Sequence, residues 1–272
     1  MSSIPIVLTV AGSDSGGGAG IQADIKSLSA NRVYAASVIT ALTAQNTMGV
    51  SAIHDVPTDF ISAQIDAVFS DLDVCAVKIG MLSQSAIIDT VVTGLKHWKA
   101  KNIVVDPVMV AESGDPLIAD DAVETLRQNL FPIAALVTPN LLEAARLTTM
   151  PVATSDDDIR EQALLISRNN EGVAVLIKGG HSESNTSRDF LFCNKNESWF
   201  ESERIDTANT HGTGCSLSSA IAANLARGME LPQAVESAKD WLTRAISAAD
   251  NLNVGKGHGP VHHFIDLWKE DL

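Results

Sequence analysis

A glycine-rich turn that leads into a helix is the segment of this sequence best suited to chemistry. The run His211-Gly-Thr-Gly-Cys215 stands directly before the apolar-periodic stretch 216–225. Gly212 and Gly214 have no side chains, so successive backbone N–H groups can point at one negative charge, reinforced by the positive end of the helix. The segment therefore predicts an anion site with a thiol in the first helical turn. An ordinary capped helix with glycines in its entry turn is the alternative.

Further polar side chains follow predicted strands. Asp106 comes directly after one apolar run, and Asn140 and Glu143 begin the helix after the next. An amide and a carboxylate three residues apart lie on one helical face, where they could help to hold hydrated Mg²⁺, although the same spacing is typical of a capped helix start. Lys178 ends a third apolar run beside two glycines, from where it could reach a phosphate or simply lie on the surface.

A second glycine-rich segment, 12–20, follows the first predicted strand. It lacks the third glycine of a dinucleotide-binding fingerprint. The nearest P-loop match, Gly20-x4-Ile25-Lys26-Ser27, has isoleucine where the second glycine belongs. What remains is a turn that lets the backbone approach a ligand, with Asp24 as a polar contact or as a solvated side chain.

The elements that must position these residues alternate between two kinds. Short continuous apolar runs predict strands that are buried on both faces: Ile6–Val10, Val74–Ile79, Ile103–Val105, Ala134–Val137 and Val173–Ile177. Stretches with helical periodicity lie between them: Ile21–Ala30, Phe60–Phe69, Ala86–Trp98, Ala122–Leu130, Leu141–Leu147 and Ile159–Ser167. This alternation predicts an α/β fold with a mainly parallel sheet covered by helices on both faces, which binds ligands at the carboxyl ends of its strands.

Two segments break the alternation. Val33–Leu42 and Val50–Val56 are both strand-like with no helix between them, so we expect a small hairpin at the sheet edge, as a lid or as a plain extension. Asp189–Arg204 places the turn Asn194-Lys-Asn196 between two β-prone runs and predicts a second hairpin. Without repeats or linkers, residues 1–272 are expected to form one domain.

Composition limits the function classes. The chain of 272 residues carries a net charge of −14, and its 19 Lys and Arg residues form no cluster, which disfavours nucleic acid and anionic membranes as partners. Three cysteines without a C-x-x-C pair indicate a reducing compartment, for which the cytoplasm is the best fit. The apolar N-terminus has no basic region, so it is predicted to be a buried strand rather than a signal or a membrane span.

The C-terminal histidines carry a weaker signal. His258 and His262 have helical spacing, with His263 beside them, but Gly259-Pro260 prevents a continuous helix through the pair. We therefore expect this tail to pack against the body of the domain rather than to bind a metal.

Eight segments together resemble the bacterial hydroxymethylpyrimidine/phosphomethylpyrimidine kinases of thiamine biosynthesis, in order and nearly end to end. They are Ala11–Asp24, Thr40–Thr47, Lys78–Leu82, Asp106–Val110, Thr138–Ala144, Lys178–His181, His211–Cys215 and Gly257–Phe264. The resemblance implies a ribokinase-like fold, ATP with Mg²⁺, and two successive phosphorylations of 4-amino-5-hydroxymethyl-2-methylpyrimidine. It also implies a homodimer.

The resemblance further implies roles for single residues. Gln45 would recognise the pyrimidine through its amide, which can both donate and accept. The rest of the pocket would comprise Gly12, Asp24, Met81 and Val108. Mg²⁺ and its waters would be organised by Asp106, Asn140 and Glu143, and phosphate oxygens would be bound by Lys178 and by Gly212, Thr213 and Gly214.

Cys215 stands where the wider sugar-kinase superfamily has an aspartate base. A helix N-terminus lowers the pKa of a thiol, so Cys215 is expected to accept the hydroxymethyl proton in the first transfer, whereas the second acceptor is already an anion. A small apolar filler is the alternative role. At the level of the whole chain, a pyridoxal kinase of the same branch and a non-catalytic ligand sensor on a kinase scaffold are the two rival functions.

Overall fold

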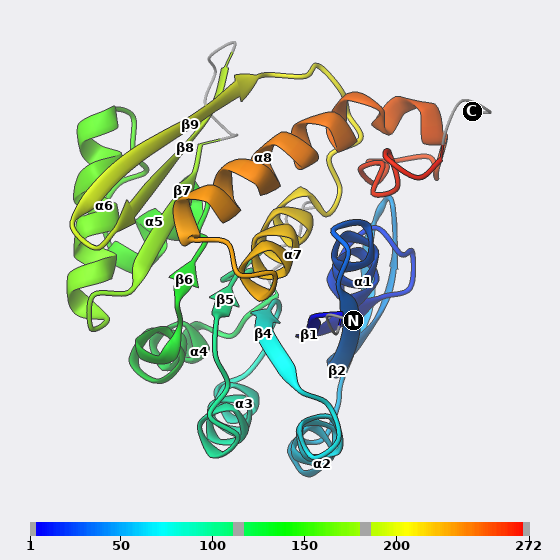
Figure 1. The fold of residues 1–272 in the computed structure, drawn as a ribbon, viewed down its shortest axis with the longest axis vertical. Helices are drawn as coiled ribbons and strands as arrows, with labels where there is room; N and C mark the ends of the chain where they lie inside the picture. Colours follow the sequence, from blue (N-terminus) through cyan, green and yellow to red (C-terminus); the bar gives the residue numbers. More distant parts are fainter. Residues whose placement is uncertain (1–3, 111–116, 180–185, 269–272) are drawn as a thin grey trace.

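A nine-stranded sheet runs through the computed structural model, which describes residues 4–110, 117–179 and 186–268 (Figure 1). Its strands lie in the order β3-β2-β1-β4-β5-β6-β7-β8-β9. Their bounds are β1 Ile6–Asp14, β2 Tyr34–Asn46, β3 Gly49–Asp55, β4 Val74–Ile79, β5 Ile103–Val105, β6 Leu136–Val137, β7 Ala174–Lys178, β8 Thr186–Cys193 and β9 Asn196–Glu203. The α-helices are α1 Gly20–Ala30, α2 Thr58–Phe69, α3 Ser85–His97, α4 Asp120–Thr125, α5 Leu141–Thr148, α6 Asp156–Asn169, α7 Thr213–Ala226 and α8 Leu231–Ser247.

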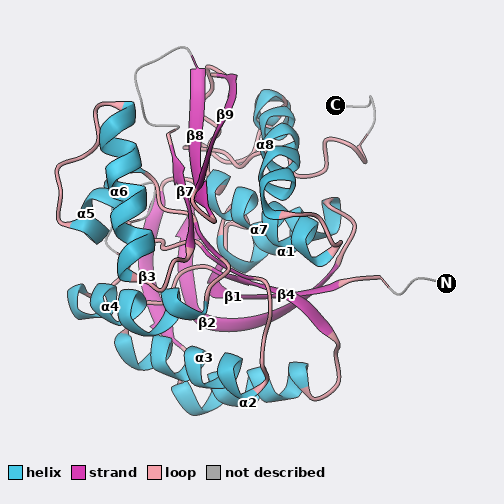
Figure 2. Cartoon of the chain, turned by 60° about the vertical axis from the view of Figure 1, so that its left-hand side comes forward, coloured by secondary structure: helices cyan, strands magenta, loops and turns pink. Residues whose placement is uncertain are grey.

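The strands from β2 to β7 are parallel, and helices cover both of their faces (Figure 2). Alternate residues of β1 belong to different apolar clusters. Leu8 and Val10 pack with residues of α2, α3 and α5, whereas Val7 packs with residues of α1, α7 and α8. Because both faces are buried, the strand sequences are continuously apolar. The predicted α/β architecture is confirmed.

Both predicted hairpins are present at the sheet edges. β3 pairs antiparallel with β2, and β8 pairs antiparallel with β7 and with β9. Asn194 and Lys195 both have left-handed backbone angles, with φ of 51° and 65°, as a two-residue type I′ turn requires.

The first strand is longer than its apolar run. β1 continues past Val10 through a bulge at Gly12 and pairs Asp14 with Thr43 of β2. The first part of the predicted glycine turn is therefore strand. A Cβ at Gly12 would lie 2.7 Å from Met81 Cε, so glycine leaves room for the methionine side chain against the strand.

The predicted helix Ala122–Leu130 is wrong in its second half. α4 ends at Thr125 and gives way to a π-helical turn, Leu126–Leu130, and a 3₁₀ turn, Phe131–Ile133. Pro132 lacks a backbone N–H and cannot continue the α-helical ladder.

The C-terminal tail packs against the body of the protein, as predicted. The N–H of His258 donates to the carbonyl oxygen of Thr47 (3.1 Å) in the turn between β2 and β3, and the N–H of Gly259 donates to Asn209 Oδ1 (2.9 Å). Over the part of the chain that the structure describes, no helix has both the length and the apolar character needed to cross a bilayer.

Candidate active site

The predicted polar residues meet at the carboxyl edge of the parallel strands. Lys178 at the end of β7 lies beside Asp106, which follows β5, with 2.7 Å between Nζ and Oδ1. The start of α7 lies against both, because a Cβ built on Gly214 would be 3.2 Å from Lys178 Nζ and 3.3 Å from Asp106 Oδ2. Residues more than a hundred positions apart thus form one cluster. Gly180 and His181, which complete the lysine motif, lie outside the described residues.

Asp106 is held by three elements. Its side chain is only 2% exposed, and its Oδ1 accepts from Thr138 Oγ1 (3.2 Å) after β6. Its Oδ2 lies 3.5 Å from Ser218 Oγ on α7. Burial alone would lower the pKa of Lys178, but Asp106 and Glu143 outweigh it and raise that pKa. Lys178 is therefore a permanent cation at the cluster.

Asn140 and Glu143 form a reciprocal cap at the start of α5. Asn140 Oδ1 accepts from the N–H of Glu143 (2.8 Å), and Glu143 Oε2 accepts from the N–H of Asn140 (2.8 Å). The pKa of Glu143 is raised to about 7. Burial is the largest cause and the charge of Asp106 adds to it, whereas Lys178 acts in the opposite direction. Three buried carboxylates, Asp24, Asp106 and Glu143, lie near two lysines, Lys78 and Lys178, and this excess of negative charge favours a further cation such as hydrated Mg²⁺. The oxygen of Asn140 already takes part in the cap.

Asp24 has no exposed surface, and both of its carboxylate oxygens are hydrogen bonded. Lys78 Nζ lies 2.8 and 3.0 Å from them, and the hydroxyls of Thr9 (2.6 Å) and Ser219 (2.8 Å) also donate to Asp24. Lys78 is not among the predicted site residues. A lysine inside a strand buried on both faces was the signal, because such a charge needs a buried partner.

The pKa of the Cys215 thiol is shifted in the direction opposite to the expected one. Burial raises the pKa of its thiol to about 11, against the opposing effect of Lys78, and the charges of Asp24 and Asp106 raise it further. The backbone N–H of Gly20 donates to the sulfur. The expectation that the helix N-terminus lowers this pKa is therefore wrong, since desolvation and two carboxylates outweigh the favourable charges.

The two glycine-rich segments touch each other. Gly212 has φ of +80°, and a Cβ there would lie 2.0 Å from the carbonyl oxygen of Gly18. Within the turn, the N–H of Thr213 donates to the carbonyl oxygen of Thr210 (3.1 Å), so Thr213 contributes to the shape of the turn. The N–H groups of Gly214 and Cys215 follow it and precede the first helical bond, from Ser216 to Gly212 (2.8 Å).

Asp14 organises the first glycine segment. It accepts from the N–H groups of Gly16 (2.7 Å), Gly18 (3.0 Å) and Ala19 (2.8 Å). Its Oδ2 also lies 3.1 Å from His211 Nε2. Burial raises the pKa of Asp14, but the hydrogen bonds from His211 and from the backbone outweigh it and lower that pKa. Sequence analysis missed this residue, because its only signal was an acidic side chain at the end of an apolar strand.

The remaining predicted pocket residues lie at the same edge of the sheet. Gln45 near the end of β2 is half-buried, with Nε2 3.4 Å from His211 Nε2. Met81 is 8% exposed and lies against Gly12. Val108 is half-buried and follows Asp106, to whose carbonyl oxygen it donates (2.8 Å). The turn from His211 to Cys215 therefore joins Gln45 at one end to Asp106 and Lys178 at the other.

Two of the C-terminal histidines, His262 and His263, are buried, whereas His258 is exposed. His263 Nε2 is 3.0 Å from Ser216 Oγ, and burial, with Lys26 and His262 nearby, lowers the pKa of His263 to about 3. In the described ranges, no three His, Cys, Asp or Glu side chains are grouped so as to hold a metal ion.

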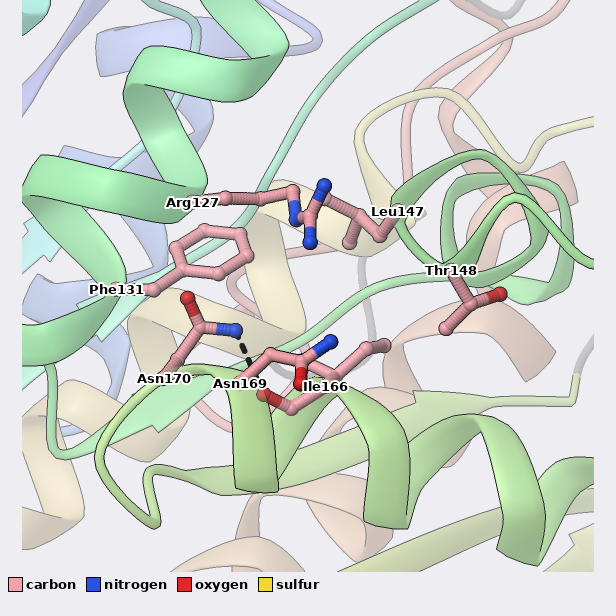
Figure 3. Close-up of a pocket in the computed structure, with 7 residues that line it drawn as sticks. All are labelled: Arg127, Phe131, Leu147, Thr148, Ile166, Asn169 and Asn170. Atoms are coloured by element: carbon pink, nitrogen blue, oxygen red, sulfur yellow. Dashed lines mark hydrogen bonds between the residues drawn. The ribbon is translucent and has the colours of Figure 1, made fainter.

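A separate hollow lies between the segment that contains Arg127 and Phe131 and the helices α5 and α6 (Figure 3). It lies near the carboxyl ends of α5 and α6, and it is too narrow to admit a water molecule. Its lining consists of Arg127, Phe131, Leu147, Thr148, Ile166, Asn169 and Asn170. None of the predicted site residues lines it, so it does not compete with the cluster as a ligand site.

The chain is similar to proteins of known activity over almost its whole length. It is 54% identical to the hydroxymethylpyrimidine/phosphomethylpyrimidine kinase of Rhizobium meliloti over 97% of this chain and 99% of that protein. It is 48% identical to the Escherichia coli protein of the same description, over 96% of this chain and 98% of the relative.

Solved structures agree on the fold. An ADP complex of Bacillus subtilis pyridoxal kinase superimposes with a TM-score of 0.89 at 35% identity, over 98% of this chain and all of that one. Phosphomethylpyrimidine kinase from Clostridium difficile gives a TM-score of 0.78 at 42% identity, over 90% of this chain and all of that one. The fold is ribokinase-like, as the resemblance implied.

The family model for phosphomethylpyrimidine kinase matches residues 14–262, a range that begins at Asp14, the residue that holds the glycine loop, and contains every residue of the cluster. With relatives that are about half identical from end to end, this match settles the family. The chain belongs to the phosphomethylpyrimidine kinase family.

Proposed function

We propose that this protein is an ATP-dependent kinase that phosphorylates 4-amino-5-hydroxymethyl-2-methylpyrimidine to its monophosphate and then to its diphosphate, in thiamine biosynthesis. The observation that carries the proposal is the contact of Gly214 with both Lys178 and Asp106 at the start of α7. A cation, a carboxylate and helix N–H groups at one point are what phosphoryl transfer requires, since its catalysis is mostly positioning and charge neutralisation.

In each transfer an acceptor oxygen bonds to the γ-phosphorus of ATP, and the bond between that phosphorus and the bridging oxygen breaks to release ADP. The N–H groups of Gly214 and Cys215 bind the transferring phosphate oxygens, and Lys178 neutralises their charge. Asp106 and Glu143 hold Mg²⁺ largely through water, with Asn140 orienting Glu143 through the cap. When bound, Mg²⁺ supplies additional charge neutralisation at the phosphates.

The pyrimidine lies between the two glycine segments in this proposal. Gln45 binds the amino group and the ring nitrogen, while Gly12, Met81 and Val108 form apolar walls. Asp24 accepts hydrogen bonds from Lys78 and Ser219, and through them it supports the start of α7, where Cys215 lies.

Cys215 accepts the hydroxymethyl proton in the first transfer. With a pKa of about 11, it carries little thiolate at neutral pH, so this step depends on a minor ionisation state. The second acceptor is a phosphate anion and has no proton whose removal the reaction requires.

A three-acceptor assay tests the function. The hydroxymethylpyrimidine, its monophosphate and pyridoxal are each incubated with ATP, and product masses are measured. We expect both pyrimidines to be used. Pyridoxal kinase is the first rival activity. Staphylococcus aureus pyridoxal kinase in complex with AMP-PCP and pyridoxal gives a TM-score of 0.89 at 30% identity, over 99% of this chain and 97% of that one. Use of pyridoxal without use of the phosphorylated pyrimidine would favour that rival, and binding without ADP release would favour a sensor.

We also propose a cytoplasmic homodimer of single-domain subunits. The hairpin of β2 and β3 exposes large apolar side chains, with Leu42 47%, Met48 69% and Ile53 41% exposed, which a second copy of the chain would cover.

One continuous sheet supports one domain for residues 1–272. Coincident unfolding transitions by fluorescence and circular dichroism would support it; separated transitions would contradict it.

A further inference from the structure

The amide of Gln45 lies between two fixed polar partners. Its Oε1 is 3.0 Å from Thr43 Oγ1, and its Nε2 is 3.4 Å from His211 Nε2. The oxygen and nitrogen of an amide are nearly alike in size and exchange by a 180° turn, so the partners decide which end belongs where.

Thr43 demands a donor from Gln45. The hydroxyl of Thr43 lies 2.9 Å from the carbonyl oxygen of Ser13, which can only accept. The single hydroxyl proton cannot serve both Ser13 and an amide oxygen; only an NH₂ group facing Thr43 lets that proton go to Ser13 while a lone pair of Oγ1 accepts from the amide, so that every group is paired. The end of Gln45 that faces Thr43 must be the NH₂ group.

His211 demands an acceptor from Gln45. Its Nε2 lies 3.1 Å from Oδ2 of Asp14, which is 2% exposed and already accepts three backbone N–H groups. An ionised carboxylate cannot donate, so Nε2 of His211 carries the proton that joins it to Asp14. That proton points at Asp14 and the protonated Nε2 has no lone pair, so an NH₂ group of Gln45 on this side would set two donors against each other, whereas an amide oxygen can share the Nε2–H with Asp14. Both partners favour the same turn of the amide.

We propose that Thr43 and the Asp14–His211 pair are positioning residues that fix the orientation of the Gln45 amide and thereby set which ring edge the pocket accepts. The inference rests on the proposed function. With the amide fixed, the substrate must place a donor opposite the oxygen on the His211 side and an acceptor opposite the NH₂ group on the Thr43 side. A 4-aminopyrimidine edge offers this pair, an amino N–H beside a ring nitrogen. The 4-oxo analogue offers the reverse, an oxygen beside a ring N–H.

The discriminating experiment compares these two substrates in the first phosphorylation. The measured quantity is kcat/KM for the 4-amino compound divided by kcat/KM for the 4-oxo analogue. In the wild type we expect a ratio of at least about 100, because mismatched buried hydrogen-bonding groups are left unpaired. Thr43→Val keeps the side-chain shape but removes the acceptor, so the amide can turn, and the ratio is expected to fall at least about tenfold.

Two further variants serve as controls. Thr43→Ser keeps the hydroxyl and should restore the wild-type ratio. Thr93→Val removes an exposed hydroxyl on α3 that donates to the carbonyl oxygen of Asp89 (2.7 Å) and should leave the ratio unchanged. If Thr43→Val does not fold, His211→Phe puts the same question to the other end of the amide and should also lower the ratio.

The outcomes separate the two proposals. A wild type that does not phosphorylate the 4-amino compound overturns the proposed function. An active wild type that treats both compounds alike overturns the present inference, and so does a Thr43→Val variant that loses kcat/KM equally for both, because a merely structural role would leave the ratio unmoved.

Discussion

At the scale of single residues, burial decides the chemistry of the cluster more than sequence motifs do. The same motif that places Cys215 at a helix start also places it beside Asp24 and Asp106, and the pKa of its thiol rises to about 11. Glu143 is likewise raised to about 7. Neither direction follows from the sequence, because both depend on neighbours that are distant along the chain.

The high pKa of Cys215 predicts how the two transfers respond to pH. Below that pKa the thiolate fraction rises about tenfold per pH unit, so the first phosphorylation should accelerate by about tenfold per unit, or about a hundredfold in all, between pH 7 and 9. The second should not follow this slope. Cys215→Ala should slow the first transfer by about 10²–10⁴-fold and abolish its slope while largely sparing the second. Single-turnover rates with each acceptor measure both effects, and equal losses would refute the role as base.

Glu143 predicts a pH-dependent affinity for Mg²⁺. Its pKa is raised to about 7, so the carboxyl is protonated below that pH and ionised above it, and only the ionised form favours a cation. Calorimetric Mg²⁺ affinity in the presence of ADP should therefore rise by up to about tenfold from pH 6 to 8, about fivefold of it below pH 7, and level off above pH 8. Glu143→Gln should bind more weakly with a flat profile over the same range. A flat profile in the wild type would contradict Glu143 as a ligand.

At the scale of elements, the sequence identifies most strands and helices because the sheet is buried on both faces. Continuous apolar runs such as Val74–Ile79 match their strands, and the hairpin turn at Asn194 is confirmed. The extension of β1 to Asp14 could not be predicted, since a bulge and a glycine hide strand pairing from periodicity. The same holds for the contact between Gly18 and Gly212, which joins two turns and leaves no local signal.

This contact between turns can be tested with a pair of glycine substitutions. Gly212→Ala introduces both left-handed strain and a Cβ 2.0 Å from the Gly18 oxygen, whereas Gly228→Ala, at φ +87°, introduces strain with no atom within 4 Å. We expect Gly228→Ala to lower the free energy of unfolding by about 1–2 kcal/mol. Gly212→Ala should lower it by roughly 1–3 kcal/mol more and abolish turnover. Denaturant titration and kcat measure the difference, and equal destabilisation would exclude a tight contact.

At the scale of the whole molecule, the hairpin of β2 and β3 at the sheet edge is the basis for the proposed homodimer. β2 belongs to the parallel sheet through β1, while β3 extends it outward and leaves apolar side chains exposed on the hairpin. An edge of this kind in a protein with net charge −14 favours a defined partner over open association, because like charges repel elsewhere on the surface.

Leu42→Asp tests the proposed dimer. A charge on the hairpin should convert the protein to a monomer, because burying an unpaired carboxylate in an apolar interface is unfavourable. Val152→Asp is the matched control, since Val152 is 43% exposed between α5 and α6, which pack beside β7, and its replacement should leave the dimer intact. Light scattering after size exclusion gives the mass. A monomeric wild type, or a Leu42→Asp variant that remains dimeric, would refute this interface.

The contact between Gly18 and Gly212, together with that between Thr47 and His258, joins the beginning of the chain to its end. A ribosome must therefore release almost the whole polypeptide before the two turns can meet. Until then the first glycine segment lacks its contact with Gly212. We therefore expect a chain that stops before His211 to be inactive in a kinase assay, because the turn that completes the site is missing.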